Sequence, residues 1–186
     1  MQADAKSLIA YSSVRHMGTM LVGVFCFNEL SLWGVWLVVV SHAFVSRLLF
    51  FLTGLNYQSY FTRQIVVLRG QANCKRVLSL IWVFALVANF SVPPFLGLLG
   101  ELSFIWILFS LDFFYMFILG VVLYLVSYCC VYMLRVVVHG QNWGGMSTVL
   151  ESEASYIVCV IHLLPVLLLT AKAGWFFCYF NSLILK

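Results

Sequence analysis

Long apolar runs separated by short polar stretches make up nearly the whole chain. A helix needs ~20 predominantly apolar residues to cross the hydrocarbon core of a bilayer. Runs of about this length recur from one end of the chain to the other, so the pattern predicts an all-α polytopic membrane protein with about six transmembrane helices. The predicted spans are about Leu8 to Phe27, Ser31 to Leu52, Val77 to Phe90, the stretch that follows to about Ser110, Phe113 to Leu134 and Ala154 to Ala173.

The fourth of these spans contains signals for a broken helix. Pro93 and Pro94 remove two backbone donors, and with Gly97 and Gly100 they predict an interruption just before Glu101. Broken helices that lie beside buried acids are typical of membrane transporters. The plainer alternative is a loop followed by an ordinary helix whose glutamate faces a headgroup or a neighbour.

Glu101 itself is the most isolated charge in the sequence. Residues 77 to 100 contain no Asp, Glu, Lys or Arg, and the next charged residue downstream is Asp112. A charge at the centre of a bilayer costs roughly 2.5 to 3.5 kcal/mol on insertion scales. Burial disfavours the charged form of a carboxylate and a nearby cation favours it, so Glu101 is our candidate for loading and releasing a proton.

The first two spans each carry a histidine near mid-depth. Arg15 and His16 are adjacent in the first span, and His42 lies in the second. Adjacent helical residues lie ~100° apart, so Arg15 and His16 cannot both face lipid. We expect His16 and His42 to face one internal polar axis that leads toward Glu101. A lone histidine is more often structural, which is our expectation for His162 in the last span.

Two polar stretches are predicted to lie outside the membrane. Residues 53 to 76 form the longest of them, with a short β-hairpin as a weak prediction, and residues 135 to 155 form the second. We interpret residues 1–186 as a single transmembrane domain, divided into a repeat over about 1–136, a connecting loop over about 136–153, and a final helix and tail over about 154–186. The basic residues of the first loop are Arg63, Arg69, Lys75 and Arg76.

Composition supports the membrane class and excludes several functions. The chain is 64% hydrophobic and 9% charged, which excludes a soluble domain. Its formal net charge of +4 comes largely from one loop and indicates membrane topology rather than nucleic-acid binding. The six cysteines lack metal-ligand spacing, and no Gly-rich nucleotide loop or flavin motif occurs. We therefore expect no metal, no cofactor and no catalytic residue on this chain, and membrane lipid as its surroundings.

Alternatives from other classes remain open at this point. A haem-binding cytochrome would use His16, His42 and His162 as ligands, but it leaves Glu101 and the double proline unexplained. A purely structural membrane subunit that does not pump, or a subunit of a cation/proton antiporter, also agrees with the pattern.

Several segments of the chain resemble a known family in matching order and spacing. The family is chain 4 of NADH:ubiquinone oxidoreductase (respiratory complex I), an antiporter-like membrane subunit, and the resemblance covers its carboxyl-terminal part only. It implies that this chain supplies the second inverted five-helix repeat plus one extra helix. The matching segments are Gln2 to Met17, Ser41 to Phe50, Leu55 to Arg63, Ala88 to Ser103 and Ile161 to Leu169.

The resemblance also implies roles for individual residues. Glu101 matches the family's broken-helix glutamate, and His16 and His42 match histidines of its central hydrophilic axis. Lys6 matches a lysine near the start of the span, where we expect a structural role. Arg15 replaces a serine of the family, so a permanent cation lies beside His16, and both Arg15 and Lys6 are treated as possible modulators.

At the level of the whole protein, the resemblance implies a multi-pass subunit of the mitochondrial inner membrane. It would contribute part of a proton-translocation channel that is coupled to electron transfer from NADH to ubiquinone, with the redox centres on other chains. The implied partners are the other membrane-arm subunits, including neighbouring antiporter-like ones, and a separate chain that carries the missing amino-terminal half. The orientation of the loop at residues 53–76 stays open, because the positive-inside rule and the family's arrangement point to opposite faces.

Overall fold

The computed structural model describes residues 4–70, 75–93, 95–139 and 153–172. The described part is helical and contains six helices, which confirms the prediction of an all-α protein. The predicted third and fourth spans, however, are the two halves of one interrupted element rather than two separate crossings. The helices are α1 (Ala5–Phe25), α2 (Glu29–Tyr60), α4 (Arg76–Asn89), α5 (Leu96–Leu111), α6 (Phe113–Val138) and α7 (Glu153–Ala171).

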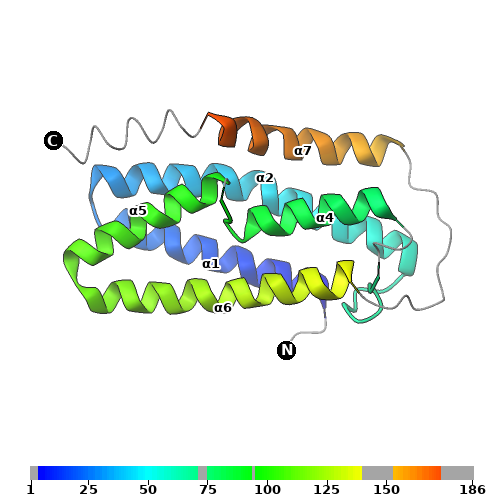
Figure 1. Ribbon diagram of the computed structural model, residues 1–186, viewed down its shortest axis with the longest axis horizontal. Helices are drawn as coiled ribbons and strands as arrows, with labels where there is room; N and C mark the ends of the chain where they lie inside the picture. The colour runs from blue at the N-terminus through cyan, green and yellow to red at the C-terminus, as the bar shows by residue number, and fades with distance from the viewer. Residues whose placement is uncertain (1–3, 71–74, 94, 140–152, 173–186) are drawn as a thin grey trace.

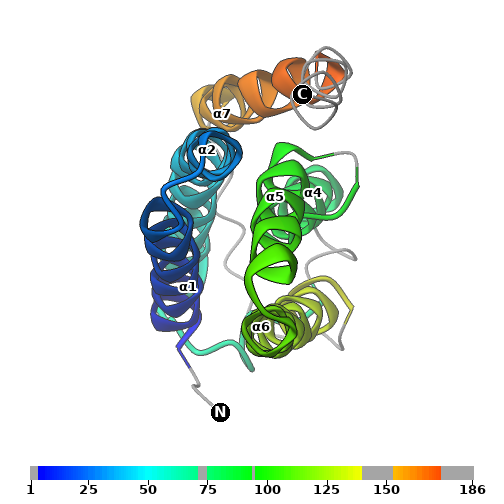
Figure 2. The same ribbon diagram turned by 90° about the vertical axis from the view of Figure 1, so that its left-hand side faces the viewer.

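The helices run along one common long axis (Figure 1). Seen from the end, α1 and α2 lie side by side, α4, α5 and α6 form a second group facing them, and α7 lies against α2 (Figure 2). Helix α2 is central to the packing, because it contacts α1, α4, α5 and α7. The arrangement brings the middle of α1 and α2 next to the junction between α4 and α5.

Helices α4 and α5 are the two halves of the broken element. They contain 14 and 16 residues, so at ~1.5 Å per residue each is shorter than the ~30 Å hydrocarbon core. They follow one another along the bundle (Figure 1), and together they provide one interrupted path across the membrane. Among the described helices, α2, α6 and α7 are each long and apolar enough to cross on their own.

The break begins with a compact helix end. Ser91 adopts a left-handed conformation with φ of 56°, and the Val92 amide donates to the Val87 carbonyl while the Ser91 amide donates to the Ala88 carbonyl. This hydrogen-bond pair is a Schellman motif, which satisfies carbonyls that the helix end would otherwise leave unpaired. Pro93 lies in the turn that follows, and Pro94 lies outside the described residues.

Gly97 and Gly100 lie inside α5 rather than in the break, which corrects our interpretation of them as part of the interruption. At Gly100 an added Cβ would meet the side chain of Val38 and would lie 2.7 Å from the carbonyl oxygen of Gly34. Gly100 is therefore required because α2 and α5 cross at very short distance. At Gly97 an added Cβ would lie 2.6 Å from the hydroxyl oxygen of Ser91 in the turn before α5, so this glycine is required for the packing of the break against α5.

Two predicted loop boundaries were wrong. Helix α2 continues to Tyr60, well beyond Leu52, and the predicted β-hairpin is absent from residues 61–70, where the structure describes one isolated bridge between Asp4 and Gln64. Helix α6 continues to Val138, and Arg135 lies in its last turn, where a cation interacts favourably with the helix dipole.

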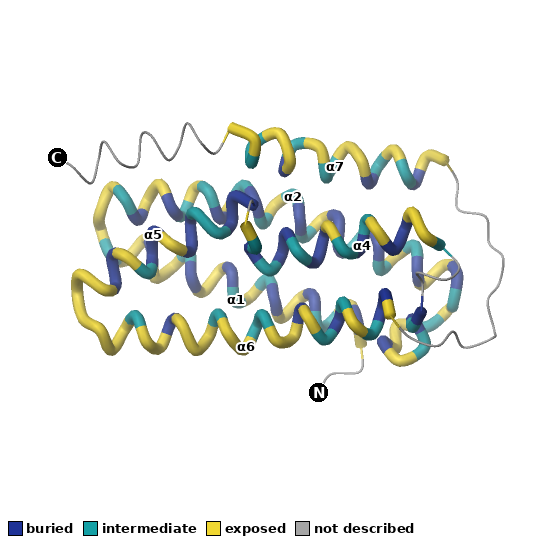
Figure 3. Tube along the Cα trace, viewed as in Figure 1, coloured by how far each residue is buried: buried dark blue, intermediate teal, exposed yellow. Residues whose placement is uncertain are grey.

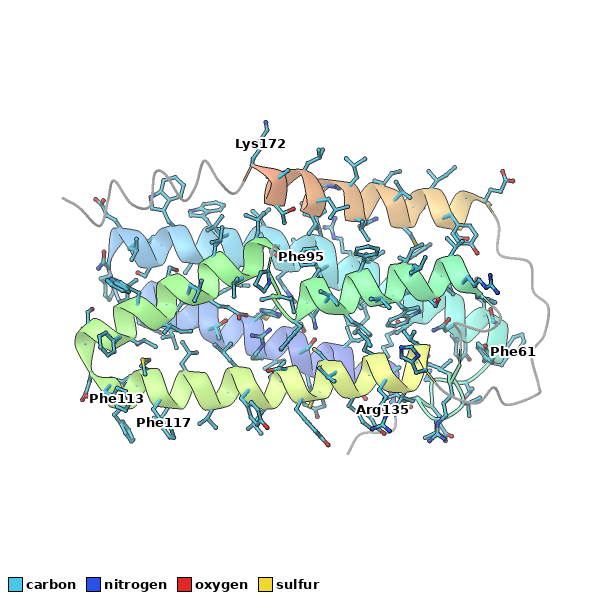
Figure 4. The ribbon with its side chains drawn as sticks, viewed as in Figure 1. Phe61, Phe95, Phe113, Phe117, Arg135 and Lys172 are labelled. Atoms are coloured by element: carbon cyan, nitrogen blue, oxygen red, sulfur yellow. The ribbon has the colours of Figure 1, made fainter. Side chains whose placement is uncertain are left out.

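The outward surface of the bundle is largely apolar. Helices α6 and α7 are exposed along most of their length in the isolated chain (Figure 3), and Phe113 and Phe117 of α6 project away from the bundle (Figure 4). The interior holds a cluster that includes Leu49, Leu52 and Trp82. An apolar exterior around a packed interior is the arrangement expected of a protein that is solvated by lipid.

Candidate functional site

A buried ion pair links α1 to the first turns of α5. The Arg15 Nη1 atom donates to Glu101 Oε1 at 2.7 Å, and the two side chains are only 7% and 9% exposed. The residues are 86 positions apart in the sequence. Because the pair is removed from water, each charge is compensated mainly by the other and by nearby hydrogen-bonding groups.

The second amino group of Arg15 continues the network in two directions. Its Nη2 atom lies 2.6 Å from Nε2 of His16 and donates to the backbone carbonyl of Asn89 at 3.4 Å. Guanidinium nitrogens only donate, so Nε2 of His16 must accept and the neutral ring carries its proton on Nδ1. That Nδ1 atom lies 3.9 Å from Glu101 Oε1, slightly too far for a hydrogen bond.

The chain reversal at the break also supplies a ligand for Glu101. The Ser91 hydroxyl donates to Glu101 Oε1 at 3.1 Å, so this oxygen receives both the guanidinium and a hydroxyl. Ser91 is in the left-handed region, a conformation that a residue with a side chain adopts at a cost. The strained turn therefore aims a hydroxyl at the buried carboxylate.

His42 extends the polar region from α1 into α2. Its ring lies against that of His16, with centroids 4.9 Å apart and planes inclined by 38°. The Nδ1 atoms of both histidines are buried without a hydrogen-bond partner among the described residues. His16 thus lies beside both Glu101 and His42, and the roles of the three residues in moving a proton stay a prediction.

The sequence model of the family described as "NADH:quinone oxidoreductase/Mrp antiporter, TM" matches residues 1–127, well over half of the chain. The chain belongs to this family.

Two relatives of this antiporter-family chain carry the same name. NADH-ubiquinone oxidoreductase chain 4 of Anopheles arabiensis is 31% identical over 187 residues, which cover 98% of this chain and 84% of the relative. The protein of the same name from Rhipicephalus sanguineus is 30% identical, with 94% of this chain and 40% of the relative covered. The chain is a homologue of chain 4, and it spans about two fifths of the length of most of these relatives.

The fold agrees with the family. A chain of respiratory complex I from Thermus thermophilus with bound NADH superposes with a TM-score of 0.84 at 21% identity, covering 94% of this chain and 37% of that chain. At this level of identity the comparison establishes the fold alone, and it confirms the fold class that was predicted.

Two residues of the site in this antiporter-family chain were missed in the sequence. Asn89 is buried, and its amide donates to Ser12 Oγ at 3.3 Å and to Cys130 Sγ at 3.5 Å, which ties α4 to α1 and α6. Ser91 is the other, as the hydroxyl donor to Glu101. An asparagine at the end of an otherwise apolar helix could have indicated a polar contact. Burial of an amide is costly unless the amide is hydrogen-bonded.

Other expected residues lie apart from the site. Lys6 is exposed in the first turn of α1, which agrees with the terminal position expected for it. Within the ranges that the structure describes, no group of three His, Cys, Asp or Glu side chains is placed to hold a metal ion.

Proposed function

We propose that this chain is a membrane-arm subunit of respiratory complex I and that Glu101 carries protons over part of a route across the membrane. The observation that supports this most directly is the position of Glu101, which is buried beside the helix break within hydrogen-bonding distance of Arg15 and Ser91. A buried acid favours its charged form when a cation is in contact with it and its neutral form when the cation moves away. A proton carrier requires these two states.

The geometry suggests how loading and release would be coupled. While Arg15 Nη1 contacts Oε1, the carboxylate is stabilised in its charged form. If Arg15 shifts toward the Asn89 carbonyl, which it already contacts through Nη2, the isolated carboxylate favours protonation. The nearest ring nitrogen is Nδ1 of His16, 3.9 Å from Glu101 Oε1. A neutral ring that gave up its one N–H proton would become an anion, so His16 would pass a proton to Glu101 only if Nε2 left Arg15 and took up another proton as Nδ1 released its own. His42 would extend the route into α2.

The redox reaction would take place elsewhere in the complex. The relatives carry the name NADH-ubiquinone oxidoreductase chain 4, and we propose that this chain likewise works in the mitochondrial inner membrane, with NADH and ubiquinone acting on other subunits. Other membrane-arm subunits would be its partners. We also propose that a unit equivalent to the unmatched first part of the relatives packs beside it, in the same or a separate polypeptide.

The distribution of charge favours one orientation. Lys6 lies in the first turn of α1, Arg76 begins α4, Arg135 lies in the last turn of α6 and Arg63 follows the end of α2. These helix ends lie at one end of the bundle (Figure 1). Glu29 and Asp112 lie at the opposite end. By the positive-inside rule we propose that the basic end faces the mitochondrial matrix.

The test of the function is Glu101→Gln in the assembled complex. The amide oxygen can still accept from Arg15 and Ser91, but it no longer neutralises the buried Arg15, so the amount of complex should fall. Pumping is therefore compared with electron transfer from NADH to ubiquinone in the complex that does assemble. The side chain no longer ionises, and the number of protons pumped per electron pair, measured in sealed membrane vesicles, should fall clearly.

Glu29→Gln is the matched control, because Glu29 is exposed in the first turn of α2 and its substitution should leave pumping unchanged. Normal pumping at normal electron flux in Glu101→Gln would refute a role for this residue as a proton carrier.

One observation favours a second candidate, a subunit that supports the complex without pumping. Arginine is charged at all physiological pH values, and Arg15 holds Glu101 in a well-formed ion pair. If the pair never opens, Glu101 would be structural. The same pumping measurement on Glu101→Gln separates the two candidates.

His162 is expected to be structural. It lies in α7, and its Nδ1 atom is 2.9 Å from the carbonyl oxygen of Val158, one turn earlier in the same helix. His162→Gln should therefore leave assembly and pumping close to normal when both are measured in membrane vesicles. A loss of pumping as large as that of Glu101→Gln would place His162 in the proton path.

A further inference from the structure

Arg47 is a charge on the outer surface of α2 at membrane depth. It lies five residues after His42 in the same helix, which is ~7.5 Å at the helical rise. His42 packs on His16 near the middle of α1. If the middle of α1 lies near the bilayer midplane, Arg47 is well within the ~15 Å half-thickness of the hydrocarbon core.

The side chain of Arg47 has no polar partner among the residues that the structure describes. It is exposed, and no hydrogen bond or ion pair joins it to any residue in the described ranges. Helical side chains lean toward the helix N-terminus, and for Arg47 this direction leads toward mid-membrane rather than toward the nearer surface. Extension of the guanidinium to the headgroups is therefore disfavoured, and the charge needs a partner within the membrane.

The residues around Arg47 allow close approach of another helix. Ala43 lies one turn before it and Gly54 two turns after it, on the same exposed side of α2. An added Cβ at Gly54 would meet nothing within 4 Å. Glycine in a helix interior is unfavourable relative to alanine, and no neighbour in the described part of the chain requires a glycine here. Small residues on an outward face are typical of helix contacts in membranes.

We propose that the face formed by Ala43, Arg47 and Gly54 binds a transmembrane helix that carries an aspartate or glutamate at the depth of Arg47. A carboxylate is the group that compensates a guanidinium best, through paired N–H donors. Ala43, one turn before Arg47, leaves room for the partner's side chain on that side of the guanidinium, and Gly54 leaves room two turns further on. The contact is independent of the proton-carrying role proposed for Glu101.

A second copy of this chain does not fit this face. The chain has six acidic residues, and in the described part Asp4, Glu29, Asp112 and Glu153 lie at or next to helix ends. Glu101 is at depth, but it is buried and paired with Arg15. Glu151 precedes α7 in sequence. The acid must therefore come from a different membrane segment.

The first test is site-specific photocrosslinking from position 43 in the complete complex in native membranes, followed by mass spectrometry of the adducts. The expected adduct is a hydrophobic polypeptide segment that contains an aspartate or glutamate within about one helical turn of the crosslink. Val131, an exposed residue of α6, provides a comparison position. Adducts from position 43 that consist of lipid alone, or of a segment without an acid, would overturn the proposal.

The second test is Arg47→Leu, for which the alternatives predict opposite results. If Arg47 faced lipid, leucine would ease insertion and the amount of complex would be unchanged or higher. If Arg47 compensates an acid of a neighbour, that acid is left unpaired and the amount of assembled complex should fall at least fivefold.

Replacing the crosslinked acid with leucine in the same cells should restore at least half of the lost complex. Failure of this restoration, or a normal amount of complex in Arg47→Leu alone, would contradict the proposal. Arg135→Leu, at the exposed end of α6, controls for the general loss of an arginine. The readout is the amount of assembled complex, so the outcome does not depend on whether Glu101 carries protons.

Discussion

Arg15→Leu is expected to cause the loss of most of the assembled complex. The substitution removes the guanidinium that contacts Glu101 Oε1 at 2.7 Å. The same guanidinium also donates hydrogen bonds to His16 Nε2 and to the Asn89 carbonyl. Breaking a buried ion pair by removing one partner typically costs about 3 to 5 kcal/mol, because the remaining charge is left uncompensated. The amount of intact complex in detergent extracts, resolved on native gels, measures the effect.

The double variant Arg15→Leu with Glu101→Gln is the decisive companion. It removes both charges, so a substantial part of the assembled complex should return while proton pumping stays impaired. Such a recovery would show that the defect of the single variant comes from an unpaired acid rather than from lost side-chain volume. An Arg15→Leu complex as abundant as the native one would contradict the importance of the pair.

Gly100→Ala is expected to have the next largest effect. An added Cβ would collide with the side chain of Val38 and lie 2.7 Å from the carbonyl oxygen of Gly34. Overpacking of a tight contact costs typically about 1 to 3 kcal/mol, and backbone atoms at this crossing cannot rotate away. Since Glu101 is the next residue, separation of α5 from α2 would also move the carboxylate relative to Arg15. We expect less complex and lower pumping.

Gly120→Ala in α6 is the matched control for this prediction. An added Cβ at Gly120 meets nothing within 4 Å, and a Gly→Ala change without strain stabilises a helix by about 0.4 to 1 kcal/mol. The thermal stability of the purified complex should therefore drop for Gly100→Ala and stay equal or rise for Gly120→Ala. Equal stability of both variants would show that the α2 and α5 contact is looser than described.

The class of the protein and its broken helix were readable from the sequence because both depend on local properties. The length of an apolar run decides whether it can cross a bilayer, and the prolines at 93 and 94 interrupt a helix wherever it lies. Glu101 stood out for the same reason, as a single charge in an apolar segment. The resemblance to the family then supplied His16 and His42, which pattern alone left ambiguous.

The ends of helices were less predictable because polarity was mistaken for exposure. Asn56 and Ser59 were assigned to a loop, yet both are buried within α2, and the Ser59 hydroxyl accepts from Lys75 Nζ at 2.8 Å. A polar residue in a membrane helix indicates either an end or an internal contact. Only its neighbours in space distinguish the two.

The partners of the site were decided by the tertiary structure alone. Arg15 was recognised as a cation beside His16, but its ion pair with Glu101 joins residues 86 positions apart, and no local signal specifies which buried charges meet. The contributions of Ser91 and Asn89 depend on the left-handed turn that ends α4. The sequence by itself determined which groups are costly to bury in the membrane, whereas the packing of α1 and α2 against α5 determined how each charge is compensated, because compensation requires contact distances that only the folded chain provides.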